Sequence, residues 1–211
     1  NALRLPERPT PLGAREALLA RTILSISGWR KVFAADGDEE STAPGLTEAD
    51  LELAACAARV FGSWFRLRSQ KAVALARDSR PTGETLQAVL LQGLLSAGVE
   101  VQVVDLCALP QFLAFVQRSE GLAGFVYLSA SHNPPGHNGF KVGLGDGCVL
   151  AAPEAAELVE RFRETYLSEA RLLEQLVAFN RVERAALEAA LSHGEAHALL
   201  VYGVEDHAVA V

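Results

Sequence analysis

The sequence predicts an α/β domain of three layers (α/β/α), in which helices cover both faces of a mixed, mostly parallel sheet built from βαβ units. Short runs rich in Val, Leu and Ala alternate with stretches of helical length. Strands that are apolar along their whole length are typical of a sheet buried on both faces. The regular alternation of strand and helix is typical of βαβ units.

The first part of the chain is expected to mix helix and loop. We predict a helix over residues 13–24 and an acidic surface loop, containing Gly, Ser and Pro, over residues 36–45. The segment 47–50, Thr-Glu-Ala-Asp, forms a capping box. It precedes a helix whose apolar residues recur every three or four positions from Leu51 to Phe65, which predicts a face toward the core.

The βαβ rhythm occupies the middle of the chain. Gly98 ends the first of its two helices, and Pro110 occupies the first turn of the second. The expected strands lie at residues 71–76, 101–106 and 122–128, and the expected helices at residues 84–97 and 110–119.

A polar loop over residues 129–138 separates this unit from the rest. A strand resumes at residues 140–143, and Pro153 marks the start of a helix that continues to Thr165.

The remaining residues are amphipathic and helical over 167–192, in two pieces broken near Asn180, and apolar enough for one more strand over 198–204. We therefore predict a first domain over residues 1–165. Residues 166–211 are predicted to form a helical connector and the first strand of a second, truncated domain.

Composition excludes several classes of function. The net charge is −7 and Lys and Arg form no cluster, so nucleic acid and anionic membrane surfaces are not expected partners. No apolar run approaches the roughly 20 residues that cross a bilayer. The three cysteines are far apart and odd in number, which is typical of buried free thiols in a reducing compartment. We expect a cytoplasmic protein.

The segment over residues 129–141, Ser-Ala-Ser-His-Asn-Pro-Pro-Gly-His-Asn-Gly-Phe-Lys, carries the most chemical information. It follows a buried strand, and ligand sites in open α/β sheets lie beyond the carboxyl ends of strands. The prolines and Gly136 turn and stiffen the loop. A serine held there can act as a nucleophile or carry a phosphate, which loop N–H groups can surround.

This segment resembles the active-site signature of the α-D-phosphohexomutase superfamily, (Thr/Ser)-Ala-Ser-His-Asn-Pro followed by Asn-Gly-(Phe/Tyr)-Lys. Residues 27–31, Ser-Gly-Trp-Arg-Lys, resemble its N-terminal Ser-Gly-x-Arg segment. Residues 76–83 resemble its Gly-Arg-Asp-x-Arg-x-Ser-Gly loop, with Ala76 in place of the first Gly. The double proline is closest to the phosphoglucomutase-like branch.

The resemblance implies an enzyme that interconverts hexose 1-phosphate and hexose 6-phosphate. Ser131 would be the phosphoserine, which forms a hexose 1,6-bisphosphate and then recovers the other phosphate. Arg30 and Lys141 would move the sugar proton and steady charge, and His132 would contact the phosphoserine or the substrate. The candidates for substrate binding or loop positioning are Ser27, Lys31, Asn133, Arg77 and Arg80.

The resemblance also implies partners outside this chain. One Mg²⁺ ion would bind through the phosphate on Ser131, while its carboxylate ligands belong to an Asp-x-Asp-Gly-Asp segment that this sequence does not contain. Glucose 1,6-bisphosphate would be the activator. The phosphosugar and the remaining domains of the same enzyme would be the partners, so this chain would be the donor-serine domain only.

Lysine usage supports the proton-transfer role independently. The chain has three lysines, at positions 31, 71 and 141, against sixteen arginines, and two of the three lie in the matched segments. Lys can lose its proton when it is desolvated, whereas Arg effectively cannot. A lysine at position 141 therefore suits proton transfer.

Other interpretations compete for the same residues. Arg77, Asp78 and Arg80 are expected to brace the loop through an internal ion pair rather than to touch substrate. His193 and His197 are one helical turn apart, but Gly194 interrupts that helix and a solvated face is the favoured interpretation. For the whole chain, the alternatives are a non-catalytic α/β module that binds phosphosugars or a partner, and an enzyme of the same fold that makes or uses a hexose bisphosphate.

Overall fold

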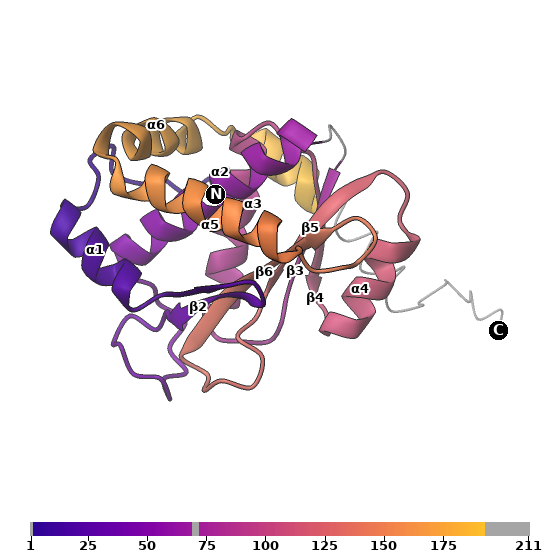
Figure 1. The fold of residues 1–211 in the computed structure, drawn as a ribbon, viewed down its shortest axis with the longest axis horizontal. Helices are drawn as coiled ribbons and strands as arrows, with labels where there is room; N and C mark the ends of the chain where they lie inside the picture. Colours follow the sequence, from indigo (N-terminus) through magenta and orange to yellow (C-terminus); the bar gives the residue numbers. More distant parts are fainter. Residues whose placement is uncertain (1, 69–71, 193–211) are drawn as a thin grey trace, which may run out of the picture.

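A computed structural model describes residues 2–68 and 72–192 (Figure 1). Within these ranges, six strands form one sheet in the order β1-β2-β6-β5-β3-β4. The strands are β1 (Ile23–Ser25), β2 (Gly28–Val32), β3 (Ala72–Arg77), β4 (Val101–Leu106), β5 (Leu122–Leu128) and β6 (His137–Leu144). The helices are α1 (Leu12–Ala20), α2 (Glu48–Arg68), α3 (Gly83–Ser96), α4 (Leu109–Arg118), α5 (Ala152–Leu167) and α6 (Glu169–Asn180), and a further helix covers 184–192.

The predicted α/β class and the mixed sheet are confirmed. Strands β2, β3, β4 and β5 run in one direction, but parallel pairing among the described strands is confined to β5-β3-β4. The other neighbouring pairs, β1-β2, β2-β6 and β5-β6, are antiparallel. Most strands of the sheet therefore share one direction, although most neighbouring pairs are antiparallel. The connections β1-β2 and β5-β6 are too short to join parallel strands.

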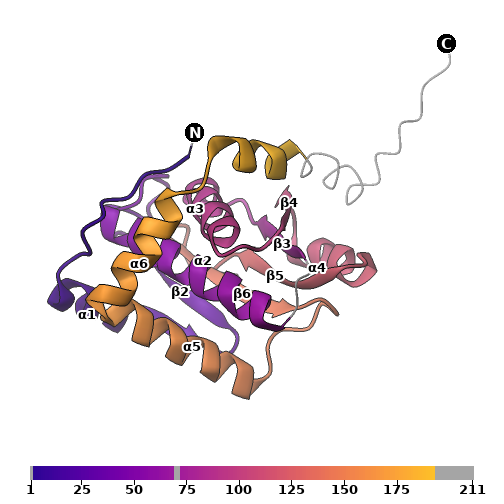
Figure 2. The same ribbon diagram turned by 90° about the horizontal axis from the view of Figure 1, so that it is seen from above.

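The helices lie on both faces of the sheet, as predicted. Helix α2 is buried along most of its length and shares one core with α3, α5 and α6 on one face. Helix α4 packs on the opposite face, where Phe112 and Val116 meet Phe125 and Tyr127 of β5. Figure 2 shows α4 separated from the other helices.

The N-terminal helix is shorter than predicted. It ends at Ala20 rather than at residue 24, because Ile23–Ser25 pairs with β2 in an antiparallel hairpin. The β-branched pair Thr22-Ile23 favours that extended backbone. The predicted capping box is confirmed in part. The Asp50 amide donates to Thr47 Oγ1 at 3.1 Å, but the Asp50 carboxylate accepts from Thr47 Oγ1 at 2.7 Å instead of from the Thr47 backbone N–H.

The C-terminal helices pack on the same core. Leu172, Phe179 and Leu187 belong to the cluster that lies against α2 and the sheet. The predicted break near Asn180 is confirmed, and the Asn180 amide group there bonds the backbone N–H and carbonyl of Leu5 at 2.9 and 2.8 Å. The division at residue 165 stays a prediction.

Several expectations fall outside the described residues, namely the strand over 198–204 and the pair His193 and His197. No helix in the described part of the chain combines the length and apolar character that crossing a bilayer requires. The three cysteines are free thiols, as predicted, but the prediction that they are buried is wrong for Cys148, which is exposed. Cys56 and Cys107 are buried, and burial raises the pKa of both thiols.

Candidate active site

The carboxyl ends of β3 and β5 meet at a topological switch point. The chain leaves β3 for α3 on one face, leaves β4 for α4 on the other face, and returns to β5 beside β3. The Asp78 amide donates to the Leu128 carbonyl at 3.0 Å, which joins the two strand ends. Open α/β sheets place their ligand sites at such a point.

Ser131 lies exposed on the loop that follows β5. Its φ is 57°, a left-handed conformation that costs roughly 1–2 kcal/mol for a residue other than glycine. Local hydrogen bonds hold it there: the Ser131 amide donates to Ser129 Oγ at 2.9 Å, and the Asn133 side-chain amide donates to the Ala130 carbonyl at 2.6 Å. The loop therefore fixes an exposed hydroxyl in one place.

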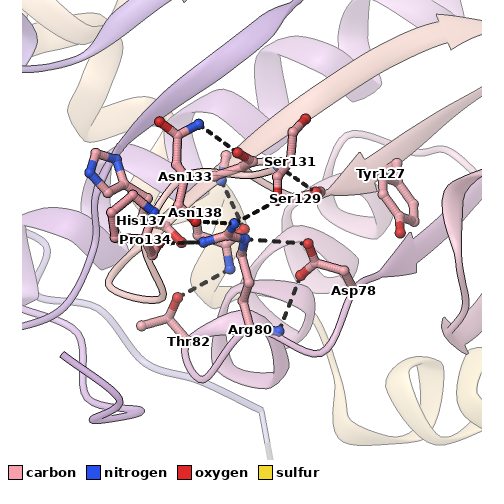
Figure 3. A network of polar contacts seen from close by, with 12 residues as sticks. Asp78, Arg80, Thr82, Tyr127, Ser129, Ser131, Asn133, Pro134, His137 and Asn138 are labelled. Atoms are coloured by element: carbon pink, nitrogen blue, oxygen red, sulfur yellow. Dashed lines mark hydrogen bonds and ion pairs between the residues drawn. The ribbon is translucent and has the colours of Figure 1, made fainter. Parts of the chain in front are cut away.

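Arg80 anchors this loop from below (Figure 3). Its side chain is only 10% exposed, and Nε lies 3.3 Å from Asp78 Oδ2. The Nη atoms donate at 2.6–2.8 Å to the carbonyl oxygens of Ser131, Asn133, Pro134 and His137. This arrangement combines the internal ion pair with direct contact to the loop backbone.

The acidic loop over residues 36–45 holds the other side of the serine loop. Gly136 donates to the Glu39 carbonyl at 2.8 Å, and its own carbonyl accepts from the amides of Phe33 and Ala34. A Cβ at position 136 would lie 2.2 Å from the Asp38 carbonyl oxygen, so only glycine fits. The sequence identified this loop only as solvated surface, since the contacts are mainly backbone contacts.

A buried pair fixes the end of the loop. Asn138 and Thr82 are both inaccessible to solvent, and Asn138 Nδ2 donates to Thr82 Oγ1 at 3.1 Å. Asn138 Oδ1 accepts from the Gly139 amide at 2.8 Å. The pair ties the start of β6 to the start of α3. Both residues lie in the segments that matched the family signature, but sequence reasoning assigned neither of them a role.

The cations Arg30 and Lys141 project from the same face of the sheet. Gly139 is opposite Arg30, and Lys141 is the second residue after Gly139 on β6, so alternation places both cations on one face. Arg30 Nε is buried without a hydrogen-bond partner among the described residues. Lys141 Nζ lies 3.5 Å from the Ser27 carbonyl oxygen. Ser129 is the first residue of the loop that carries Ser131, and its amide donates to the Gly139 carbonyl at 3.0 Å.

Arg30, Lys141 and Ser27 therefore gather on the sheet face that continues into the Ser131 loop. Exposed His132 and half-buried Asn133 follow Ser131 on that loop. The arrangement offers a hydroxyl, two cations and an imidazole, which suits transfer of an anionic group.

Two predicted site residues lie elsewhere. Lys31 is 7% exposed and pairs with Asp50 at 2.6 Å on the opposite face from Arg30, because adjacent residues of a strand point to opposite faces. Arg77 Nε contacts Gln87 Oε1 and Asp105 Oδ1, each at 3.1 Å. It is directed toward α3 and β4, and no hydrogen bond joins its side chain to the described residues of the serine loop.

The described residues do not form a metal site by themselves. They include no group of three or more His, Cys, Asp or Glu side chains that could hold an ion. A phosphate on Ser131 would be one oxygen ligand, and Mg²⁺ requires near-octahedral oxygen coordination. The donor set therefore does not fit a resident Mg²⁺ ion without ligands from outside these residues.

Comparison with known proteins finds a match to the part of the chain that contains these site residues. The model of the family described as phosphoglucomutase/phosphomannomutase, alpha/beta/alpha domain I, matches residues 27–169. A phosphoglucosamine mutase of Parasynechococcus marenigrum is 37% identical over 126 residues, which are 56% of this chain and 27% of that protein. A phosphoglucosamine mutase of Streptococcus mutans is 43% identical over 86 residues, 41% of this chain and 19% of that protein.

A solved structure agrees with these relatives. The crystal structure of a phosphoglucomutase/phosphomannomutase family protein from Burkholderia thailandensis matches with a TM-score of 0.51 and 27% identity. The match covers 67% of this chain and 31% of that one. This chain thus spans about a quarter of the length of the relatives it matches.

Proposed function

The chain belongs to the phosphoglucomutase/phosphomannomutase family, and from this premise we propose that Ser131 carries the phosphate in an intramolecular phosphotransfer between two hydroxyls of a hexose. The observation that carries the proposal is the exposed Ser131, held in a left-handed conformation by a loop that Arg80 anchors through four carbonyl oxygens. A nucleophile held in position lowers the entropic part of the barrier.

The reaction runs in two balanced halves. The phosphoserine Oγ–P bond breaks while a sugar hydroxyl oxygen forms a new bond to phosphorus. The hydroxyl proton ends on Ser131 Oγ, and a hexose 1,6-bisphosphate and a free Ser131 hydroxyl result. In the second half the Ser131 hydroxyl oxygen attacks the other phosphate, the bond between that phosphorus and the sugar oxygen breaks, and the serine proton ends on the sugar oxygen. This restores the phosphoserine and releases the isomeric monophosphate.

The neighbouring cations have distinct parts in this scheme. Lys141 is the candidate to carry the hydroxyl proton, which only an uncharged amine accepts. Its Nζ lies 3.5 Å from the Ser27 carbonyl oxygen and has no carboxylate partner among the described residues. Arg30, on the same sheet face, is the candidate to steady the transferring oxygens. His132 is exposed beside the serine and contacts the phosphate or the sugar.

The remaining parts of the site belong to this proposal as well. We propose that other domains of the same enzyme supply the carboxylates for Mg²⁺ and the contacts to the distal phosphate, and that glucose 1,6-bisphosphate activates the enzyme. Lys31 and Arg77 then act on positioning rather than on substrate. The free cysteines favour a cytoplasmic enzyme.

The sugar is proposed to be a hexose phosphate. The double proline favours glucose, whereas the relatives from Parasynechococcus and Streptococcus are phosphoglucosamine mutases. Parallel rate measurements with glucose 1-phosphate and glucosamine 1-phosphate decide between them. The sugar phosphate that the native protein converts faster, at a rate that Ser131→Ala abolishes, identifies the sugar.

The test of phosphate uptake is peptide mass spectrometry. The native protein is incubated with glucose 1,6-bisphosphate and Mg²⁺, beside the variants Ser131→Ala and Ser79→Ala. Ser79 is exposed on the neighbouring loop and serves as the matched control. We expect phosphate on the peptide containing Ser131 in the native protein and in Ser79→Ala, and none in Ser131→Ala. No phosphate on Ser131 in any sample would favour the non-catalytic binding module.

A further inference from the structure

A path of hydrogen bonds runs from the interior to the backbone amide of Ser131 (Figure 3). It begins at two side chains that are inaccessible to solvent, those of Thr82, directly before α3, and Asn138, the second residue of β6. Asn138 Nδ2 donates to Thr82 Oγ1 at 3.1 Å, and Asn138 Oδ1 accepts from the Gly139 amide at 2.8 Å. The Gly139 carbonyl accepts from the Ser129 amide at 3.0 Å, and Ser129 Oγ accepts from the Ser131 amide at 2.9 Å.

Thr82 occupies the N-cap position of α3 without capping the helix. A threonine at this position ordinarily accepts a hydrogen bond from a backbone amide in the first helical turn. The Thr82 hydroxyl makes no such bond and accepts from Asn138 instead. The hydroxyl therefore serves the connection to β6 rather than the start of the helix.

The middle of the path is rigid and shielded from water. Gly139 is buried and lies so close to β2 that a Cβ at this position would be 2.0 Å from the Trp29 carbonyl oxygen. Ser129 is buried as well. Hydrogen bonds shielded from water are stronger than the same bonds in solvent, so a position set at Thr82 is carried to the loop.

The two peptide groups that flank Ser131 are held from different sides. The Ser131 amide, at the end of the path, donates to Ser129 Oγ, while the Ser131 carbonyl accepts from Arg80 Nη2 at 2.8 Å. The φ of 57° is unfavourable for a residue other than glycine, and such a conformation persists only where its surroundings fix it. Holding both peptide groups fixes the direction of the Cα–Cβ bond that carries the hydroxyl.

We infer that Thr82 and Asn138 are positioning residues for phosphate transfer, which keep the Ser131 oxygen in line with the sugar hydroxyl through this path. The inference rests on the proposed phosphate-carrying role of Ser131. Neither side chain reaches solvent, so neither touches the substrate. Their effect is one of geometry, and a misplacement of about 1 Å can lower the rate of a reaction roughly 100-fold.

Thr82→Val tests the inference because it removes the hydroxyl, keeps the shape and costs no side-chain cap. Native and variant proteins are phosphorylated with glucose 1,6-bisphosphate, and transfer from Ser131 to a hexose monophosphate with Mg²⁺ is followed in a single turnover over a series of sugar concentrations. We expect the rate constant at saturating sugar to fall about tenfold or more, while the sugar concentration that gives half of the maximal rate stays the same. Thr82→Ala removes the same hydroxyl and should show the same loss. Thr82→Ser keeps the hydroxyl and should recover most of the native rate.

Two further variants separate positioning from a general loss of stability. Thr165→Val makes the same substitution on α5, where the hydroxyl donates to the Arg161 carbonyl. Asn180→Leu removes a buried amide that bonds the backbone of Leu5, so it should unfold at a lower urea concentration. Both variants should transfer phosphate at the native rate. A loss of rate in Asn180→Leu equal to that in Thr82→Val would overturn the positioning role.

Amide hydrogen exchange tests the path without catalysis. In the unphosphorylated protein, the Ser131 amide should exchange faster in Thr82→Val than in the native protein and in Thr165→Val, and equal exchange would overturn the inference. If the native protein takes no phosphate on Ser131, the proposed function fails and exchange alone decides whether the path holds the loop. If it does take phosphate, an unchanged transfer rate in Thr82→Val would overturn the positioning role and leave the proposed function intact.

Discussion

The serine loop depends on Arg80, and its replacement by methionine gives the sharpest prediction. Arg80→Met keeps a long side chain with an aliphatic stem but removes the guanidinium. That group donates to four carbonyl oxygens at 2.6–2.8 Å and lies 3.3 Å from Asp78. A hydrogen bond to a charged group contributes about 1.5–3 kcal/mol. Four at the lower limit would contribute about 6 kcal/mol.

The measured loss will be smaller because part of the loop regains water. Ser131 is exposed and Asn133 is half-buried, so their carbonyl groups can be solvated in the variant. We therefore expect Arg80→Met to lower the free energy of unfolding by about 3–4 kcal/mol. Urea unfolding measures this loss, and hydrogen exchange should show faster exchange at the amides of Ser131 and Asn133.

Two further variants complete the experiment. Arg80→Lys keeps the charge, but one ammonium cannot reproduce the planar fork of donors, so its loss should be intermediate. Arg161→Met removes an exposed partner of Glu157 on α5, and its loss should stay below about 1 kcal/mol. A loss below about 1 kcal/mol in Arg80→Met, with unchanged exchange in the loop, would refute the anchoring role.

Three other predictions concern single side chains. Ser131→Ala should abolish phosphate uptake, which intact mass measures. Because the side chain is exposed, the free energy of unfolding should change by less than about 0.5 kcal/mol in urea unfolding. A large destabilisation would contradict the exposed placement of Ser131. Lys31→Met should cost about 3–5 kcal/mol in urea unfolding, because it leaves Asp50 charged and buried without its partner; a loss typical of a surface pair would contradict this. Burial raises the pKa of Glu52 above its ordinary value, so the folded state binds the proton more tightly than the unfolded state does. The contribution of Glu52 to stability is therefore complete below the ordinary pKa and is lost as pH rises through the raised pKa of the folded state. Urea unfolding of the native chain and Glu52→Gln over a pH series should therefore show the variant gaining on the native chain as pH rises, and a constant difference would disprove the assignment.

Local patterns were sufficient for much of the fold. Strands β4 and β5 have the predicted bounds, and α2 begins directly after the predicted cap residue Thr47, whose Oγ1 accepts from the Asp50 amide. These elements are predicted by the spacing of apolar residues, by turn residues and by helix caps, all of which lie within a few positions of each other in the sequence. The Ser131 loop was predicted for a similar reason, because its residues are contiguous.

The N-terminal hairpin illustrates what local patterns miss. Strand β2 exists because it pairs with β6, more than 100 positions later in the chain. Without that strand, both residues were assigned to the site, Arg30 as a catalytic residue and Lys31 as a candidate for substrate binding or loop positioning. Once β2 is recognised, alternation sends Arg30 to the site face and Lys31 to Asp50.

The loop contacts show a second limit. Gly136 is held by the backbone of Phe33, Ala34 and Glu39, and backbone contacts leave little trace in side-chain identity. Arg77 lies three positions before the loop anchor Arg80 but is directed away from the loop by Asp105 and Gln87. Only the packing of α3 and β4 determines that direction.

Transfer of the phosphate from Ser131 to a sugar tests the central claim most directly. The native protein, phosphorylated with glucose 1,6-bisphosphate and freed of excess, is mixed with a large excess of hexose monophosphate and Mg²⁺. The peptide containing Ser131 is then weighed at intervals, and the bisphosphate formed is measured beside it. We predict that phosphate leaves Ser131 while an equal amount of hexose bisphosphate appears. Phosphate that stays on Ser131, or that leaves only as inorganic phosphate, would contradict a phosphate-donating serine.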